Sequence, residues 1–414
     1  MKGGLEQRPS KRRDAVRSKK TRSSSKTTAT TPLEATAWWR RAWLALNTDE
    51  WRVPLAIFFG SRLAILLFLF VFGGLVQPLL ANKPATLLDM LTRWDGGWYA
   101  GIATHGYSWK GPETQSGVAF FPLYPLLARI LSLVLFGNVR LALVIISNLA
   151  GLAYFCFLYR LVKRDFDASA AERSTLYVGI CALSFFLSAG YTESLMLALV
   201  TGAFYFARKE SWVPAIILGT LAPVCRSAGL AIVLPLMWEW RHQKGLTPRA
   251  LLLLVLPVGL AVYMIYLWRL TGDPLAFVTV QQAWYHQFTW PWTTLKIAWD
   301  LVTPVPQAAY AAAIATVDFS FMIGMLVLLL ISLRLLPPAY SLYSWPVFFL
   351  AMSATLTQGL PTASIGRYLM ALFPAFVTLG VLGKNKYLHY AVLFCNAVLW
   401  GVLLLYFAAG IWVE

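Results

Sequence analysis

The chain has 414 residues, of which 58% are hydrophobic and 13% are charged, and its formal net charge is +17. A soluble domain carries about 25% charged residues, so this composition excludes an ordinary soluble enzyme. Apolar runs of about 20 residues recur from residue 54 to the C-terminus, and this is the length that a helix needs to cross a bilayer. The sequence therefore predicts an all-α polytopic membrane protein.

The first 50 residues differ in composition from the rest of the chain. The segment "SKKTRSSSKTTATTP" is basic, rich in Ser and Thr, and without apolar periodicity. We expect residues 1–50 to form a disordered cytoplasmic tail that fixes topology and touches anionic lipid. Nucleic-acid binding is a minor alternative, because no aromatic platform accompanies the charges. Residues 51–414 are then the transmembrane domain, whose first span is a retained signal anchor.

Eleven spans follow when the apolar runs are cut at polar breaks. With the tail inside, 25 of the 35 Lys and Arg residues fall on inner segments, as the positive-inside rule requires. The run Phe120–Phe136 holds two Pro and an Arg, so we interpret it as an interfacial helix on the outer face. The predicted spans are 54–81, 139–162, 174–190, 192–208, 212–225, 226–241, 249–270, 312–334, 342–358, 367–383 and 387–411.

This topology collects isolated charged residues on the outer side. The first outer loop is long, roughly residues 82–138, and four other outer segments each contribute one charge. Charges near membrane depth usually pair or line a cavity. We therefore expect a polar site just below the outer surface, built from Asp95, Glu193, Arg226, Asp273 and Arg367.

Asp95 lies in the stretch "RWDGGWYAGIA" of the first outer loop. In an aromatic setting its carboxylate can act as a base on a hydroxyl, or it can cap a short helix through "GGWYAGIATHG". The residues alone leave both readings open. The side chains of Trp94, Trp98 and Tyr99 suit either sugar rings or an interfacial aromatic belt.

Of the other charged residues, three have two possible roles each and one is first a turn residue. Glu193 in "YTES" either opens the next helix or lends polarity to the site. Arg226 in "PVCRSAG" and Arg367 in "IGRY" either hold a phosphate or form structural ion pairs. Asp273 in "GDP" is first a turn residue.

The second long outer segment, Leu270–Gln287, holds a group of polar side chains. Gln281, Gln282 and His286 are expected on one face of a short helix, where they suit a ligand rich in hydroxyls. No His or Cys stands at metal-ligand spacing, and no Walker loop, GxGxxG, HExxH, GxSxG or CxxC motif occurs. We therefore expect neither a metal nor a cofactor.

The motifs "RWDGGWYAGIATHGY", "AFFPLYPLL", "SAGYTESL", "CRSAG", "GDPLAF…QQAW" and "SIGRYLMALFP" occur in one order along the chain. This ordered set resembles the PIG-V family of membrane mannosyltransferases, within the GT-C glycosyltransferase architecture, over about residues 54–383. The resemblance implies a bundle of helices whose long first outer loop carries interfacial helices. It implies a donor that is a sugar, usually mannose, on a polyprenyl or dolichyl phosphate, and transfer with inversion.

The resemblance also implies roles for residues. Asp95 is then the catalytic base, and we expect Arg226 and Arg367 to bind the donor phosphate.

The partners are the lipid-phosphate donor, a lipid-linked or glycan acceptor and membrane lipids, without nucleic acid. The short chain and its basic tail favour a prokaryotic plasma membrane over the endoplasmic reticulum, with the site on the outer face. The competing class is a lipid or lipid-linked-sugar flippase without transferase activity. The candidate substrate contacts are Arg93, Trp94, Trp98, Tyr191, Glu193, Gln281, Gln282, His286 and Tyr368.

Overall fold

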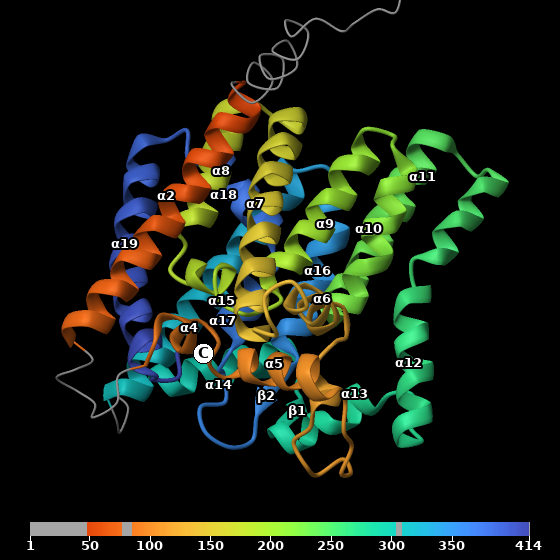
Figure 1. The fold of residues 1–414 in the computed structure, drawn as a ribbon. Helices are drawn as coiled ribbons and strands as arrows, with labels where there is room; N and C mark the ends of the chain where they lie inside the picture. The colour runs from red at the N-terminus through yellow and green to blue at the C-terminus, as the bar shows by residue number, and fades with distance from the viewer. Residues whose placement is uncertain (1–47, 77–84, 304–308, 414) are drawn as a thin grey trace, which may run out of the picture. The chain divides into compact units, whose positions relative to one another are not determined.

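The computed structural model describes residues 48–76, 85–303 and 309–413 of the chain. Apart from residues 48–50, the predicted tail lies outside this part. The described residues form one compact unit that is mostly helical (Figure 1). Two short strands, β1 (His286–Phe288) and β2 (Ala354–Leu356), pair antiparallel.

Each predicted span overlaps a helix or a broken helix, but residues 77–81 of the first span lie outside the described residues and the span 342–358 runs past α16 into β2. The long helices are α2 (Asp49–Val71), continued by a π-helical turn to Val76, and α7, α15 and α19. The others are shorter or interrupted, since Pro, Gly and polar residues stand at their breaks. Their bounds are α7 (Val139–Asp165), α8 (Ala168–Ile180), α9 (Glu193–Arg208), α10 (Trp212–Cys225), α11 (Val233–Lys244), α12 (Val258–Thr271), α15 (Ala309–Leu335), α16 (Pro338–Met352), α18 (Phe373–Leu382) and α19 (Lys386–Ala409).

The predicted count of eleven spans is not confirmed. Within the described residues, four helices are long and apolar enough to cross a membrane. A fifth arises if the 3₁₀ helix Pro248–Val255 and α12 are one span with a bend of 41°. The remaining predicted spans fall on shorter helices, so crossing by these segments stays a prediction.

The core of the bundle lies around α7 and α9. Helix α7 packs against α2, α8 and α9, while α10 covers α9 and α18 lies against α8. Large side chains fill the interior without exposure, among them Tyr154, Phe155, Phe204 and Phe373. Aromatic pairs such as Phe204 on Phe373, at 5.3 Å between ring centroids, fix how these helices meet.

Ion pairs mark one end of the bundle. There Arg208 lies 3.2 Å from Asp165 and 3.3 Å from Glu239, and Lys163 lies 3.2 Å from Glu50. All of these residues belong to segments predicted on the inner side or to the ends of spans that lead into them. This grouping agrees with the predicted topology, and the side of the membrane that each end faces stays a prediction.

The opposite end carries the short elements that connect the spans. Figure 1 shows α5, β1, β2 and α14 gathered there. Helix α6 exposes Leu126 and Ile130 and buries Tyr124 and Ala128, which is an amphipathic pattern. It covers only part of the interfacial helix predicted for Phe120–Phe136, and its placement in a membrane surface stays a prediction. The elements at this end are α4 (Leu87–Leu91), α5 (Asp95–His105), α6 (Leu123–Ser132), α13 (Ala276–Thr279), α14 (Pro291–Val302) and α17 (Ile365–Leu369).

Candidate active site

Asp95 is the first residue of α5, and its carboxylate does not cap that helix. The N-cap residue is Trp94, which makes no side-chain cap bond and has a φ of 50°. Such a conformation is sparsely populated for a bulky residue and costs about 1–3 kcal/mol. Oδ2 of Asp95 instead accepts a hydrogen bond of 2.8 Å from Nη1 of Arg367. The capping reading is therefore not confirmed, and the role of Asp95 in a catalytic site stays a prediction.

Arg367 is buried where it meets Asp95. It lies in α17, and its side chain is 4% exposed, against 20% for Asp95. Its guanidinium lies 5.3 Å from the ring centre of Tyr191 and 5.4 Å from that of Tyr368. A cation at this depth is held by its carboxylate partners and by aromatic faces.

Glu193 connects the two arginines. Its Oε1 lies 2.5 Å from Nη1 of Arg226 and 3.7 Å from Nε of Arg367. Arg226 also donates to the hydroxyl of Thr192 at 3.3 Å, and its guanidinium lies 5.0 Å from the ring centre of Tyr368. Glu193 does lie in the first turn of α9, but its carboxylate is used in this network. We call Asp95, Arg367, Glu193 and Arg226 the charged network; it holds two positive and two negative groups.

Backbone contacts bring these distant segments together. The N–H of Gly190 donates to the carbonyl of Leu91 at 2.7 Å, which joins the turn before α9 to the end of α4. A Cβ at Gly96 would stand 3.4 Å from the carbonyl oxygen of Gly190, which is an ordinary contact distance. The hydrogen bond from Gly190 to Leu91 thus joins the segment before Asp95 to the turn before Glu193.

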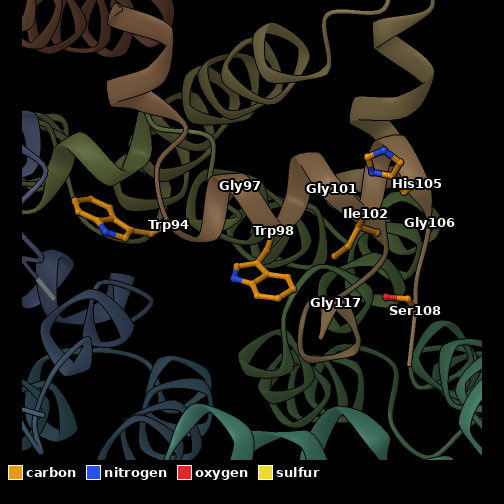
Figure 2. Close-up of a pocket in the computed structure, with 9 residues that line it drawn as sticks. All are labelled: Trp94, Gly97, Trp98, Gly101, Ile102, His105, Gly106, Ser108 and Gly117. Atoms are coloured by element: carbon orange, nitrogen blue, oxygen red, sulfur yellow. The ribbon is translucent and has the colours of Figure 1, made fainter. Parts of the chain in front are cut away.

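A groove of about 380 Å³ runs along one face of α5, starting next to Asp95. Figure 2 shows the indole rings of Trp94 and Trp98 projecting from the first turns and His105 at the far end. Gly97 and Gly101 lie between them, and a Cβ at either position would have no atom within 4 Å. The groove is therefore open space along the helix that begins at Asp95, with two indoles, an imidazole and the hydroxyl of Ser108 on its walls.

The prediction that Gln281, Gln282 and His286 lie on one face of a helix is wrong for His286. The two glutamines lie in a 3₁₀ helix, Val280–Trp284, which ends at Tyr285 with a φ of 62°, and His286 begins β1. Gln281 donates to the carbonyl of Phe277 at 3.1 Å, and Gln282 is exposed. Asp273 is a turn residue, as predicted, since its carboxylate accepts from the N–H of Leu275.

His286 still lies near the charged network. Burial lowers the pKa of His286, the charge of Arg367 lowers it further and Asp95 opposes this. Its Nδ1 is buried and has no hydrogen-bond partner among the described residues. Trp284, whose ring centre is 5.1 Å from that of Trp98, connects this segment to the groove.

Arg93 does not contact the charged network through its side chain in the described structure. Its Nη1 donates to the carbonyls of Phe407 and Ala408, at 3.1 and 2.9 Å, in the last turn of α19. Its own carbonyl accepts from the hydroxyl of Tyr191 at 3.1 Å. Tyr191 is buried between this backbone and Arg367, and its contact with substrate stays a prediction.

Asp318 is a residue near the site that sequence reasoning missed. It lies in α15 with no exposure, and Oδ2 accepts from the hydroxyl of Thr362 at 3.0 Å. Thr362 belongs to the segment that leads into α17 and Arg367. The signal was present in the sequence, because a carboxylate inside an apolar span is a site candidate by default.

A comparison with sequence models of protein families shows to which family the chain belongs. The sequence model of the mannosyltransferase (PIG-V) family matches residues 70–302, more than half of the chain. The chain belongs to this family. The PIG-V match includes Asp95, Glu193 and Arg226 and ends before α15, so Arg367 and Asp318 come from outside it. A sequence search of curated proteins finds no match.

Solved structures agree with the PIG-V assignment at the level of the fold. ArnT from Cupriavidus metallidurans, bound to undecaprenyl phosphate, is similar with a TM-score of 0.51 and 15% identity, over 82% of this chain and 62% of that one. An oligosaccharyltransferase from Archaeoglobus fulgidus gives 0.42 and 13%, over 87% and 55%. The same organism's AglB, with an inhibitory peptide and a dolichol-phosphate, gives 0.41 and 14%, over 90% and 55%. At 15% identity the ArnT likeness concerns the fold alone.

Proposed function

We propose that the chain transfers mannose from a polyprenyl phosphate to a hydroxyl of a lipid-linked or glycan acceptor, with inversion at the anomeric carbon. Family membership supports the sugar. The undecaprenyl phosphate bound by ArnT, a protein of similar fold, supports the lipid phosphate. The observation that carries the proposal is the Asp95 carboxylate, held through one oxygen by Arg367 at the start of α5, the helix that lines an open groove.

Asp95 acts as the general base. Oδ2 is occupied by Arg367, and among the described residues no hydrogen bond or ion pair reaches Oδ1. Oδ1 takes the proton of the acceptor hydroxyl while that oxygen forms a bond to the anomeric carbon. The bond from this carbon to the phosphate oxygen breaks in the same displacement, and the lipid leaves as its phosphate.

The charges of the site change in the direction that the reaction needs. At rest the two arginines of the charged network are balanced by Asp95 and Glu193. When Asp95 takes the proton it loses its charge, and the leaving phosphate gains one negative charge. Arg367 and Arg226 then form a net positive pair that stabilises the phosphate as it departs.

The substrates would occupy different sides of Asp95. The donor phosphate lies toward Arg226, the more exposed arginine with a side chain 20% exposed. The acceptor sugar lies in the groove of α5, where Trp94 and Trp98 offer flat faces and polar edges. Gln281, Gln282, His286 and Tyr368 complete the sugar contacts. The reaction needs no metal, and the site faces the outer side of a prokaryotic plasma membrane with the N-terminus inside.

A transfer assay tests this function. Membranes that contain the chain are incubated with radiolabelled polyprenyl-phosphate mannose and an extract of acceptor lipids. Label that moves into a lipid or glycan supports the transferase. Donor that crosses the bilayer with its label intact, and without transfer, supports a flippase and overturns the proposal.

A further inference from the structure

The C-terminal helix binds the backbone that leads into Asp95. The last turn of an α-helix has carbonyls without partners inside the helix, and its end carries partial negative charge. Arg93 meets two of these carbonyls in α19, those of Phe407 and Ala408, from a position two residues before Asp95. Figure 1 shows the end of α19 next to α4 and α5. These contacts join the first outer loop to the last helix.

The residues that follow α19 complete the contact. The helix ends at Gly410, which has a φ of 78°. A Cβ at Gly410 would stand 2.7 Å from Nη1 of Arg93, so glycine leaves the space that the guanidinium occupies. Trp412 then packs edge-on against Trp94, with 5.2 Å between ring centroids, and Phe407 lies 5.3 Å from the same ring.

These contacts act on the one strained residue next to Asp95. Trp94 has a φ of 50°, which a bulky residue keeps only where its surroundings hold it. The backbone angles at Trp94 decide where the Asp95 carboxylate points. Arg93 holds the chain on one side of Trp94, and the ring contacts to Phe407 and Trp412 hold Trp94 itself.

We propose that Arg93, Gly410 and Trp412 form a clamp that positions Asp95 for catalysis, so that Arg93 is a positioning residue and not a contact to donor or acceptor. This inference rests on the proposed function for its kinetic readout. The partners of Arg93 lie in α19, beyond the region that the PIG-V family model matches.

Steady-state kinetics of transfer separates positioning from substrate binding. Arg93→Ala is expected to lower kcat by about tenfold to a hundredfold, as a small misplacement of a catalytic group does, with donor KM unchanged. Arg93→Lys, which can still reach one carbonyl, is expected to recover part of kcat. A raised donor KM with kcat unchanged would mean that Arg93 binds donor, and it would overturn the clamp.

A second-site variant tests the clamp from α19. Gly410→Ala crowds the guanidinium without changing the first outer loop, and it is expected to lower kcat in the same way. The double variant Arg93→Ala with Gly410→Ala is expected to be no slower than Arg93→Ala alone, since both remove one contact. Gly60→Ala in α2, where a Cβ meets no atom within 4 Å, controls for the added methyl group. Gly272→Ala, at the αL C-cap of α12 with a φ of 81° and no atom within 4 Å of a Cβ, controls for the backbone strain. Effects of Arg93→Ala and Gly410→Ala that multiply would contradict a shared mechanism.

Hydrogen–deuterium exchange tests the proposed clamp without a transfer assay. The amides of residues 94–100 are expected to exchange faster in Arg93→Ala, Gly410→Ala and Trp412→Ala than in the parent chain and in Gly60→Ala. Unchanged exchange in all three variants would overturn the clamp. A parent chain that transfers no sugar would overturn the proposed function and leave this measurement to decide the clamp.

Discussion

Nη1 of Arg367 lies 2.8 Å from Oδ2 of Asp95, although 272 positions separate the two residues in the chain. The contact fixes the orientation of the carboxylate and leaves its second oxygen for a substrate. It also keeps a buried cation beside the proposed base.

Removal of the base should abolish transfer. Asp95→Asn keeps the size and an acceptor oxygen for Arg367 but cannot take a proton, so we expect transfer to fall by about 10²–10⁴-fold. The measurement is label transfer in purified membranes at matched protein amounts. Asp300→Asn, an exposed carboxylate on α14, is the control and should retain activity. Wild-type transfer by Asp95→Asn would remove Asp95 from the mechanism.

Glu193 should matter for both stability and donor use. Glu193→Gln leaves Arg226 without its carboxylate at a buried position, and such a break costs about 3–5 kcal/mol. Thermal unfolding in detergent should show this loss, with a smaller loss in the double variant Glu193→Gln, Arg226→Met. Losses in Glu193→Gln and in Arg226→Met that add up to the loss in the double variant would show that the pair is not coupled.

The groove on α5 can be tested by filling it. An exposed helical Gly→Ala change normally stabilises by about 0.5–1 kcal/mol, and Gly101 has room for the added carbon. We therefore expect Gly101→Ala to unfold at an equal or higher temperature, and Gly101→Leu to raise the acceptor KM. Hydrolysis of the donor by water should persist in both variants. An acceptor KM that Gly101→Leu leaves unchanged would place the acceptor elsewhere.

Thr362 should help to hold Arg367 in place. Thr362→Val removes the hydrogen bond to Asp318, while Thr362→Ser retains the hydroxyl. Loss of a buried hydrogen bond costs about 1–3 kcal/mol, so Thr362→Val should melt earlier and transfer more slowly than Thr362→Ser. The two variants are compared by thermal unfolding and by kcat. If they behave alike, the bond to Asp318 does not support the site.

Acidification should destabilise the protein through His286. Burial and the charge of Arg367 lower the pKa of His286 below its ordinary value of about 6.5. The folded state therefore binds this proton less readily than the unfolded state. The resulting stability is fully present above that value and is lost as pH falls through the lowered pKa.

The comparison of the parent chain with His286→Gln measures this effect. Between about pH 7.5 and about pH 5.5 the melting temperature of the parent should fall further than that of His286→Gln, which has no proton to bind at this position. A parallel fall in both proteins would assign the acid sensitivity to other groups.

Sequence patterns identified all four residues of the charged network because charge is costly in an apolar chain. Asp95, Glu193, Arg226 and Arg367 stood out as isolated polar residues, and charge counting placed them at one end. Asp318 carried the same signal within α15 and was passed over. His286 was assigned to a helix because periodicity does not reveal a residue such as Tyr285, whose positive φ ends the 3₁₀ helix.

By itself, the sequence determined the helical membrane class, the PIG-V relationship and the candidate charges, since these depend on composition, run length and ordered motifs. Only the tertiary structure decided the partners. It paired Asp95 with Arg367, joined both arginines through Glu193 and assigned Arg93 to the end of α19. The reason is physical: these contacts join residues far apart in sequence, and the packing of whole helices sets their distances.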